Sequence, residues 1–270
     1  MRSPLAVVRG GGDLATGTIN RLFKSGFRVI VLEIKVPTMI RLSVSAATAV
    51  FDENIIIEDV RYQYVKSAHE ALELTRDESV PVLVDPNMDS LRELKPDVLI
   101  DATLAKRNMG IHMQLAPIVI GLGPGFTAGE DCHAVIETSR GHDLGVIIYS
   151  GSALPNTGIP GLIAGYAEER VIRAPGSGYL KAIKKIGDLV TAGECIGSVN
   201  DAPVLANIEG VLRGLIHESV PVSKGMKIGD VDPRANIEAC TSISDKARAL
   251  GGSVLEAYLS LSGVLNQVEY

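Results

Sequence analysis

The sequence has few of the residues on which several classes of protein depend. It contains no tryptophan, only 4% aromatic residues, and a net charge of −6. We therefore expect no nucleic-acid partner, because base stacking requires aromatic rings and a phosphate backbone requires a basic surface. The three cysteines, Cys132, Cys195 and Cys240, form no CxxC pair. This spacing argues against a disulfide framework or a cysteine zinc site, and it favours a reducing, cytoplasmic location.

Long apolar runs are also missing. The LAVV run at residues 5–8 is too short for the apolar part of a signal peptide. Residues 144–167 carry no charge, but proline, asparagine and repeated glycine interrupt them. We therefore predict a strand and an interdomain loop at 144–167, and no membrane partner.

The first 35 residues have the pattern of a strand, a glycine turn, a helix and a second strand. The turn fits the G-x-G-x-x-G/A pattern of dinucleotide-binding proteins, with Gly10, Gly12 and Ala15 in the small positions. Glu33 follows Gly12 by 33 − 12 = 21 residues, where an acid can accept a hydrogen bond from a ribose hydroxyl. The pattern predicts that the backbone N–H groups of Gly10, Gly11 and Gly12 hold a pyrophosphate.

Asp13 fits this prediction less well, because a carboxylate repels a phosphate. We expect it to cap the helix or to bind a hydroxyl group or a metal. The alternative for the whole segment is a tight turn that binds nothing.

Further apolar runs end at Asp85, Thr103 and Gly123 and alternate with helical segments, which is typical of a parallel sheet. Ligands in such sheets bind beyond the carboxyl ends of the strands. We therefore expect Thr103, Lys106 and Arg107 to lie near the glycine turn, with the two cations facing a phosphate or carboxylate. Solvated surface is the alternative for Lys106 and Arg107.

Residues 121–145 concentrate glycine and reactive side chains. Gly123 and Gly125 allow a second close approach of the backbone to a ligand, and Arg140 suits an anionic group. Residues 134–136 and 145–149 are predicted to form a hairpin. The candidate catalytic residues are His133, Glu137 and His142.

The residue types of this stretch also suit two other chemistries. Cys132 and His133 point apart in a strand, so a nucleophilic pair would need His142 or His112 as the partner of Cys132. Asp131, His133 and His142 have suitable groups for a metal but no ligand-spacing signature. Hydrogen bonding to a polar ligand is the favoured interpretation.

The carboxyl-terminal half contains a repeat at an offset of 206 − 174 = 32 residues, which indicates duplicated hairpin units. The phrase RAPGSGYLKAIKKIGDLVTAGECIGSV resembles half of a biotinyl or lipoyl carrier domain, the barrel-sandwich hybrid. No lysine occurs between Lys185 and Lys224, so no covalent biotin or lipoate is expected. Ser244 is the expected N-cap of a final helix that packs on the first domain.

These patterns predict an α/β fold class with three parts. They are a Rossmann-like parallel-sheet domain at 1–165, a small all-β barrel-sandwich hybrid domain at 168–235 with the internal repeat, and a C-terminal helical segment at 236–270.

Several long phrases also resemble one family along nearly the whole chain, the accessory proteins of selenium-dependent molybdenum hydroxylase systems. The phrases are RGGGDLATG, VLEIKVPT, DATLAKRN, GLGPGFTAGED, HAVIETSRGH, SGSALPNTGIPG, KGMKIGDVDPR and ISDKARALGG. The resemblance implies a role in cofactor maturation, with a molybdenum hydroxylase or its maturation proteins as partners.

The resulting hypothesis is a maturation factor that binds a nucleotide-like small molecule, either NAD(P) or a molybdopterin dinucleotide. The first alternative is a free-standing NAD(P)-dependent oxidoreductase with His133 or His142 as proton donor. The second is a non-enzymatic docking scaffold. The sequence leaves open whether the chain forms a homo-oligomer and whether it is an enzyme.

Overall fold

The structure is a computed structural model that describes residues 3–76, 79–156, 158 and 162–264. The chain divides into two compact units, which are described separately here. Unit 1 comprises Met1–Lys35, Ser45–Asn156 and Ile243–Tyr270, and unit 2 comprises Val36–Val44 and Thr157–Ser242. Part of the loop predicted within 144–167, at Thr157 and 159–161, lies outside the described residues.

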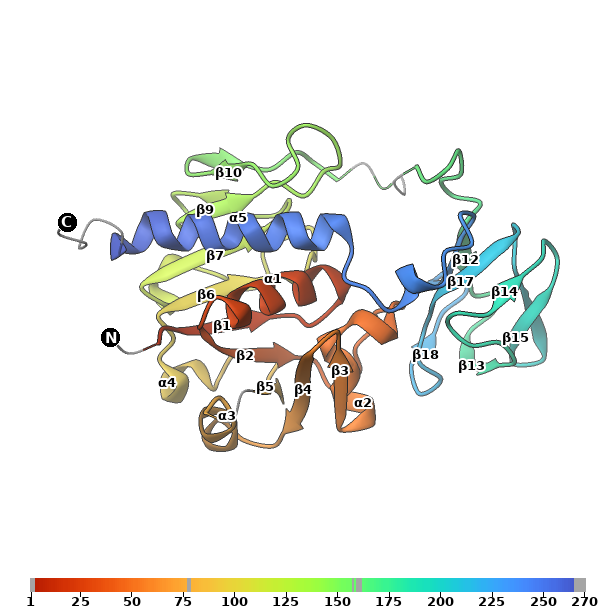
Figure 1. The fold of residues 1–270 in the computed structure, drawn as a ribbon, viewed down its shortest axis with the longest axis horizontal. Coiled ribbons are helices and arrows are strands. Elements are labelled where there is room, and N and C mark those ends of the chain that lie inside the picture. The colour runs from red at the N-terminus through yellow and green to blue at the C-terminus, as the bar shows by residue number, and fades with distance from the viewer. Residues whose placement is uncertain (1–2, 77–78, 157, 159–161, 265–270) are drawn as a thin grey trace. The chain divides into compact units, whose positions relative to one another are not determined.

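Unit 1 is built around one nine-stranded sheet with the order β10-β9-β7-β6-β1-β2-β5-β4-β3 (Figure 1). Its strands are β1 (Leu5–Arg9), β2 (Arg28–Glu33), β3 (Asn54–Ile57), β4 (Val60–Val65), β5 (Ser79–Val84), β6 (Val98–Asp101), β7 (Ile118–Leu122), β9 (Ala134–Ile136) and β10 (Ile147–Ile148). The seven strands from β9 to β4 pair in parallel, whereas β3 and β10 pair antiparallel to their neighbours. A separate small sheet joins β8 (Thr127–Ala128) to β11 (Gly151–Ser152).

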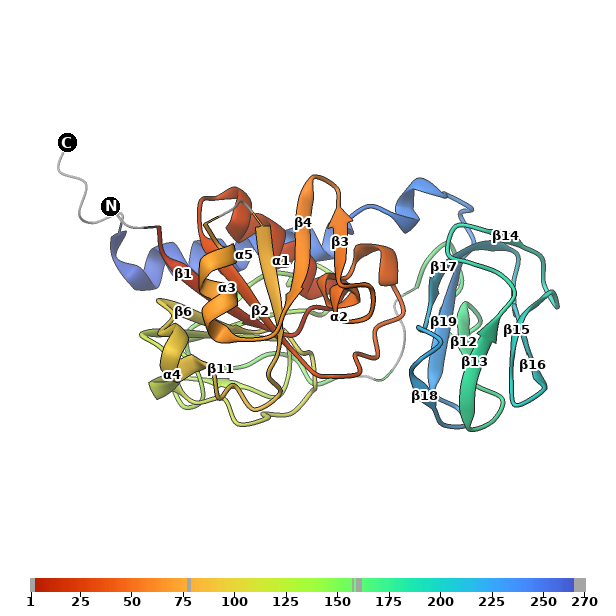
Figure 2. The ribbon, with the colours of Figure 1, turned by 90° about the horizontal axis from the view of Figure 1, so that it is seen from below.

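Helices cover both faces of this sheet (Figures 1 and 2). One face carries α1 (Asp13–Lys24) and α5 (Asp245–Ser262); the other carries α3 (Ala68–Leu74) and α4 (Leu91–Leu94). Side chains along β1 point alternately to the two faces of the sheet. Leu5 and Val7 lie on the face that carries α3 and α4, where they cluster with residues of these helices. The short α2 (Ala49–Asp52) follows the 3₁₀ turn η2 (Ala46–Thr48), and η3 (Met113–Leu115) precedes β7.

The helices α1 and α5 lie side by side with their N-termini at the same end (Figure 1). A Cβ on Gly17 would lie 2.3 Å from the carbonyl oxygen of Ala247, and one on Gly251 would lie 2.6 Å from the carbonyl oxygen of Gly17. Only glycine permits this close approach. Ser244 caps α5 by accepting a hydrogen bond from the N–H of Ala247 at 3.2 Å.

Unit 2 consists mainly of two four-stranded sheets with the orders β12-β19-β17-β14 and β16-β15-β13-β18. The strands are β12 (Val171–Arg173), β13 (Gly178–Ala182), β14 (Leu189–Val190), β15 (Cys195–Val199), β16 (Ala202–Leu205), β17 (Gly210–Leu215), β18 (Pro221–Val222) and β19 (Lys227–Asp232). The 3₁₀ turns η1 (Leu42–Val44) and η4 (Glu238–Cys240) also belong to this unit.

Equivalent positions of the 32-residue repeat have the same conformation in unit 2. Gly178 and Gly210 have φ values of 146° and 154°, in a region that favours glycine. The strand register pairs Gly178 with Val222 and Gly210 with Val190. The glycine that begins a strand in each repeat segment therefore pairs with a residue of the other segment. The apolar positions of the repeat, from Leu180 to Ile228, are buried.

The fold that the sequence predicts needs correction, because only the general α/β class is confirmed. The sheet of unit 1 is mixed rather than parallel, since β3 pairs antiparallel with β4 and β10 pairs antiparallel with β9. The pairing of β9 with β10 is the hairpin predicted at 134–136 and 145–149. Unit 2 is not the contiguous biotinyl/lipoyl-like domain predicted at 168–235, because it includes Val36–Val44 and extends to Ser242.

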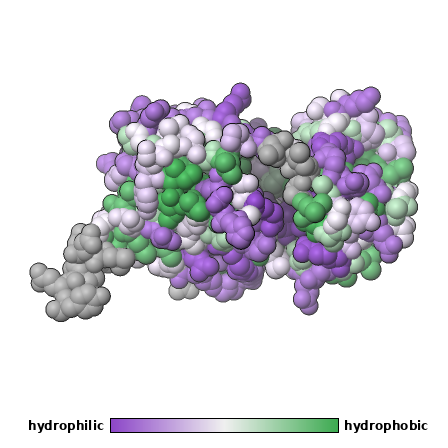
Figure 3. All heavy atoms as spheres, turned by 90° about the horizontal axis from the view of Figure 1, so that it is seen from above, coloured by the Kyte–Doolittle hydropathy of each residue, from purple (hydrophilic) through white to green (hydrophobic). Residues whose placement is uncertain are grey.

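The surface of unit 1 is predominantly polar in Figure 3, where apolar residues gather in one area of the left-hand body. None of the helices in the described part of the chain combines the length and the apolar character that a membrane span requires.

Candidate functional site

The glycine turn between β1 and α1 is held by backbone contacts on one side. The N–H of Gly10 donates to the carbonyl of Leu32 at 2.8 Å, and the carbonyl of Gly11 accepts from the N–H of Ala47 at 2.9 Å. A Cβ on Gly11 would lie 2.8 Å from that nitrogen. Gly10 has φ +92°, and a Cβ there would meet Ala102 and Thr103. Glycine is therefore required at both positions by the protein's own packing.

Glu33 bonds to the turn rather than projecting away from it. Its Oε2 accepts from the N–H of Gly11 at 2.7 Å, and its Oε1 accepts from the N–H of Ile34 at 2.7 Å. Burial raises the pKa of Glu33, against the lowering effect of these two hydrogen bonds and of Arg9. The carboxylate predicted to bind a ribose is thus engaged with backbone amides.

Gly12 differs from its two neighbours in the turn. It is the N-cap of α1, with an extended backbone at φ −67°. Among the described residues, no atom lies within 4 Å of the place a Cβ on Gly12 would take. Asp13 and Ala15 follow in the first turn of α1, Asp13 half-buried and Ala15 buried. The turn is therefore open on the side where Gly12 and the start of α1 lie.

Arg9 ties together the loops at the ends of neighbouring strands. Its guanidinium forms an ion pair with Asp101 at 3.1 Å and donates to the carbonyls of Met109 at 2.9 Å and Pro86 at 3.1 Å. Asp101 also accepts from the N–H and hydroxyl of Thr103 at 3.0 and 2.6 Å. These contacts lie where the strand order switches from β1 to β6, the edge at which open α/β sheets bind ligands.

The loop after β6 reaches this edge, and its cations are exposed. Lys106 has φ +63°, and both Lys106 and Arg107 face solvent. A Cβ on Gly125 would lie 2.5 Å from the backbone nitrogen of Arg107. Gly125 therefore serves a contact between two loops. The contact with a ligand that its position predicts stays a prediction.

Gly123 lies at the end of β7, beside the end of β9. A Cβ there would lie 2.7 Å from the hydroxyl oxygen of Thr138. Glu137, 3% exposed, accepts from the N–H of Ser139 at 2.6 Å and from the N–H of Leu154 at 2.7 Å. The side chain thus holds two segments in place, and both its oxygens are occupied.

The residues predicted from 121–145 do not form one group. His133 accepts a hydrogen bond at Nδ1 from the N–H of Val119 at 3.0 Å, near the beginning of β7. Gly123 and Glu137 lie at the opposite ends of β7 and β9, roughly 13 Å away for four residues of strand. His142 is exposed in the loop that follows Glu137. His133 is therefore separated from Glu137, so the three catalytic candidates do not form one group.

Asp131 and Cys132 also have structural contacts. Asp131 accepts from the side-chain amide of Asn108 at 2.8 Å and from the N–H of Thr127 at 2.8 Å. Cys132 is buried, and burial raises the pKa of its thiol to about 11, so the thiol stays protonated at neutral pH. Because His112 and His142 are exposed, neither shares its buried surroundings.

No group of three or more His, Cys, Asp or Glu side chains that could hold a metal occurs in the described ranges. The predicted set of Asp131, His133 and His142 is divided between the two edges of the sheet.

Lys246 is the residue that the sequence did not single out. It lies at the start of α5, where its pKa is lowered first by burial and then by the nearby charge of Arg140. Asp13, Glu137 and Asp245 act in the opposite direction. Arg140 itself pairs with Asp245 at 3.3 Å. The Ser244 cap predicts where α5 starts. No local sequence pattern shows that charged residues following β9 and on α1 lie near this start.

The candidate site is therefore the carboxyl edge of the sheet around Gly12, Arg140 and Lys246. It combines the beginnings of two parallel helices, a half-buried lysine and an exposed arginine. Helix N-termini and cations both favour an anion. This arrangement can bind a negatively charged group.

No family model matches the chain. The chain is 50% identical over 257 residues to the uncharacterized protein YqeB of Escherichia coli (strain K12), covering 95% of this chain and 48% of that protein. It thus spans about half the length of this curated relative.

Two solved structures were matched to the structure of this chain, both with low TM-scores. One is an aspartoacylase family protein from Mesorhizobium loti, with 10% identity and a TM-score of 0.27, and the match covers 85% of both chains. The other is a succinylglutamate desuccinylase/aspartoacylase from Rhodobacter sphaeroides, with 12% identity, a TM-score of 0.25 and again 85% of both chains.

These comparisons correct the family and function expected from the sequence. No family model matches the chain and the relative is uncharacterized, so nothing points to selenium-dependent molybdenum hydroxylases. We withdraw the maturation role and its two alternatives, an NAD(P)-dependent oxidoreductase and a docking scaffold. It stays a prediction that the chain binds a dinucleotide, that it has the partners expected from the sequence, and that it forms a homo-oligomer.

Proposed function

We propose that unit 1 binds a small molecule through a single phosphate or carboxylate group at the carboxyl edge of its sheet. Lys246 carries this proposal, because it is a half-buried cation at the start of α5, beside the start of α1. Two parallel helix N-termini each contribute partial positive charge there. Burial is the main cause that lowers the pKa of Lys246 and the charge of Arg140 is the second, so an anion beside Lys246 would stabilise its charged form.

The acidic groups nearby are compatible with this ligand. Both oxygens of Glu137 accept from backbone amides, and Asp245 pairs with Arg140. Asp13, on the first turn of α1, suits a hydroxyl group of the ligand better than its anion. The proposed class is therefore a hydroxylated metabolite that bears one phosphate or carboxylate.

A single anionic group fits better than a pyrophosphate that extends along β2. Ala47 packs against Gly11, and Glu33 bonds to the N–H of Gly11, so the β2 side of the turn is closed. The side toward Gly12 is open.

Calorimetric titration with glycerol phosphate and with lactate tests the proposal. Lys246→Gln should weaken binding by roughly 10- to 150-fold, because a charge-assisted hydrogen bond contributes about 1.5–3 kcal/mol. Lys66→Gln, an exposed lysine on the same unit, is the matched control and should leave binding unchanged. Equal affinities of the two variants would refute the role of Lys246.

A second variant tests the place of the ligand. Gly12→Val adds a side chain where no described atom lies within 4 Å, so the fold should persist while binding is lost. Circular dichroism checks the fold. NAD and NADP serve as further ligands, and binding that Glu33→Gln abolishes would instead support the predicted dinucleotide.

A further inference from the structure

Strand β3 forms one edge of the sheet of unit 1, where β4 is its neighbour among the described strands (Figures 1 and 2). In an antiparallel pair, alternate residues exchange backbone hydrogen bonds with the partner strand, and the residues between them direct their N–H and C=O groups away from it. The N–H of Tyr64 donates to the carbonyl of Glu53 at 2.8 Å, which fixes this alternation. Asn54 and Ile56 therefore direct their backbone groups to the open edge.

The outward backbone groups of β3 are available to a ligand. No hydrogen bond within the described part of the chain engages the outward N–H or C=O of Asn54 or Ile56. The side chain of Asn54 is exposed and that of Ile56 is 57% exposed. An added strand presents backbone donors and acceptors at the spacing that such an edge offers. An extended peptide segment is therefore the ligand that the edge fits.

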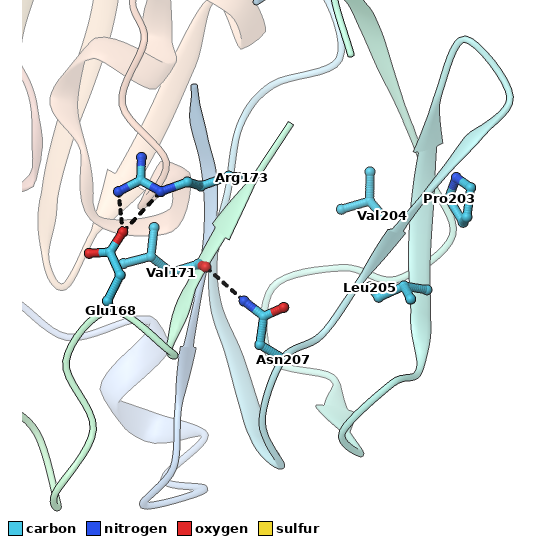
Figure 4. A pocket seen from close by; sticks show the side chains of 7 residues that line it. All are labelled: Glu168, Val171, Arg173, Pro203, Val204, Leu205 and Asn207. Atoms are coloured by element: carbon cyan, nitrogen blue, oxygen red, sulfur yellow. Dashed lines mark hydrogen bonds and ion pairs between the residues drawn. The ribbon is translucent and has the colours of Figure 1, made fainter. Parts of the chain in front are cut away.

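The other edge strands that the structure describes are protected or shorter. Strand β16 also has four residues, but it contains Pro203, which has no N–H to donate to an added strand (Figure 4). The remaining edge strands, including β10, β12, β14 and β18, have two or three residues. Proline and short length are both common ways to prevent pairing at an edge. Strand β3 has neither a proline nor so short a length.

Acidic residues lie at both ends of β3. Asp52 and Glu53 come directly before the strand and are exposed, and Glu58 and Asp59 come directly after it. Glu58 and Asp59 each pair with a basic side chain of unit 1. Asp52 and Glu53 form no ion pair with any described residue. The uncompensated negative charge therefore lies at the N-terminal end of β3.

These charges argue against a second copy of the chain as the occupant. In the antiparallel register that uses Asn54 and Ile56 of both copies, Asp52 of one copy lies opposite Glu58 of the other. Like charges directly opposite each other destabilise a pair of strands, whereas opposite charges stabilise it. The charge complement of this edge is a segment with lysine or arginine beside Asp52 and Glu53.

We propose that the edge of β3 binds an extended segment of a partner protein by strand addition, with an apolar side chain beside Ile56 and lysine or arginine beside Asp52 and Glu53. Antiparallel pairing is the more stable arrangement per residue, and it places the basic residues at the C-terminal end of the segment. This surface uses no residue of the proposed anion site.

The test is an amide chemical-shift titration of the full-length chain with the acetylated and amidated peptide TVTVKK. It should shift the amide resonances of Asn54 and Ile56 and bind about tenfold more tightly than TVTVEE, because two opposite-charge pairs become like-charge pairs in the second peptide. Equal binding of the two peptides would refute recognition by charge. Shifts that leave Asn54 and Ile56 unchanged would refute the place of binding. Tighter binding of KKVTVT than of TVTVKK would overturn the antiparallel arrangement.

Variants separate the backbone contacts from the charges. Ile56→Pro removes one outward N–H, and proline is tolerated in an edge strand where that N–H faces solvent. It should abolish binding of TVTVKK, while circular dichroism matches the wild type. Asp52→Asn combined with Glu53→Gln should weaken binding about tenfold, whereas Glu130→Gln, another exposed acid of unit 1, should leave it unchanged.

Two outcomes would overturn the proposal. One is undiminished binding of TVTVKK by the double variant of Asp52 and Glu53. The other is a dimer of the chain in analytical ultracentrifugation that Ile56→Pro dissociates, because a second copy would then be the occupant of the edge.

Discussion

The two units use most of their buried and half-buried carboxylates in different ways. In unit 1, Glu33, Asp85 and Glu137 accept hydrogen bonds from backbone N–H groups beyond the ends of strands. Asp101, which pairs with Arg9, is an exception in this unit. In unit 2, Asp230 and Asp232 bind arginine side chains. Acids that bond to backbone amides hold loops, whereas acids that bond to arginines connect strands and side chains within a sheet.

This difference matters for the proposed anion site. The carboxylates of unit 1 position the loops at the carboxyl edge of the sheet, which is that proposed site. The ion pairs of unit 2 run as a chain from Arg170 through Asp230, Arg213 and Asp232 to Arg234.

The largest effect is expected from breaking the arginine network. Asp230→Ala should lower the free energy of unfolding by about 3–5 kcal/mol, because it leaves the buried Arg170 and the largely buried Arg213 without their shared carboxylate. Urea titration measures this change, and hydrogen exchange should show it in β17 and β19. A loss below about 1 kcal/mol would show that the network is not a stabilising feature of unit 2.

An intermediate effect is expected from a carboxylate that holds loops. Glu137→Gln should cost about 1–3 kcal/mol, because the amide oxygen can accept from only one of the N–H groups of Ser139 and Leu154. The same urea titration applies, with Glu130→Gln as the control because Glu130 is exposed. Matching stabilities of the two variants would contradict the loop-holding role.

The smallest effect is a difference in pH dependence. Burial raises the pKa of Asp232, but hydrogen bonds from Arg234 and the charges of Arg213 and Arg234 outweigh it, so the net pKa is lowered. Its contribution to stability is present above the unfolded pKa of about 4 and is lost as pH falls through the folded pKa. The pKa of Glu33 is raised, so its contribution is present below the unfolded pKa and is lost as pH rises through the folded pKa.

Urea titrations at several pH values should therefore show opposite trends. Relative to the wild type, Asp232→Asn should lose the decline in stability on acidification, and Glu33→Gln should lose a decline on going from about pH 4 to neutral pH. Parallel trends in the two variants would show that the two kinds of carboxylate do not differ in this respect.

Local patterns in the sequence predicted several elements because their causes are local. The run LAVVR, the glycines that follow it and the helical spacing after Gly12 correspond to β1, the turn and α1. Ser244 caps α5 as its hydroxyl group predicts. The hairpin predicted at 134–136 and 145–149 is confirmed by the antiparallel pairing of β9 and β10. The expected parallel sheet was wrong at β3, because strand direction depends on which neighbour a strand finds.

The site was less predictable than the strands. Glu33 lies beside the glycine turn, but the distance in sequence could not show that its oxygens bond to the N–H groups of Gly11 and Ile34. His133 and Glu137 were grouped because they are near in sequence, yet β9 places them at opposite ends of a strand.

By itself, the sequence determined the α/β class, the glycine turn and the absence of a lysine between Lys185 and Lys224. These follow from periodicity, backbone freedom and composition, which act over a few residues. Only the tertiary structure decided that Lys246 joins Arg140 and Asp13, and that Gly17 and Gly251 meet. These contacts join segments more than 100 residues apart, and no short-range preference encodes such a pairing because it depends on how all the elements pack at once.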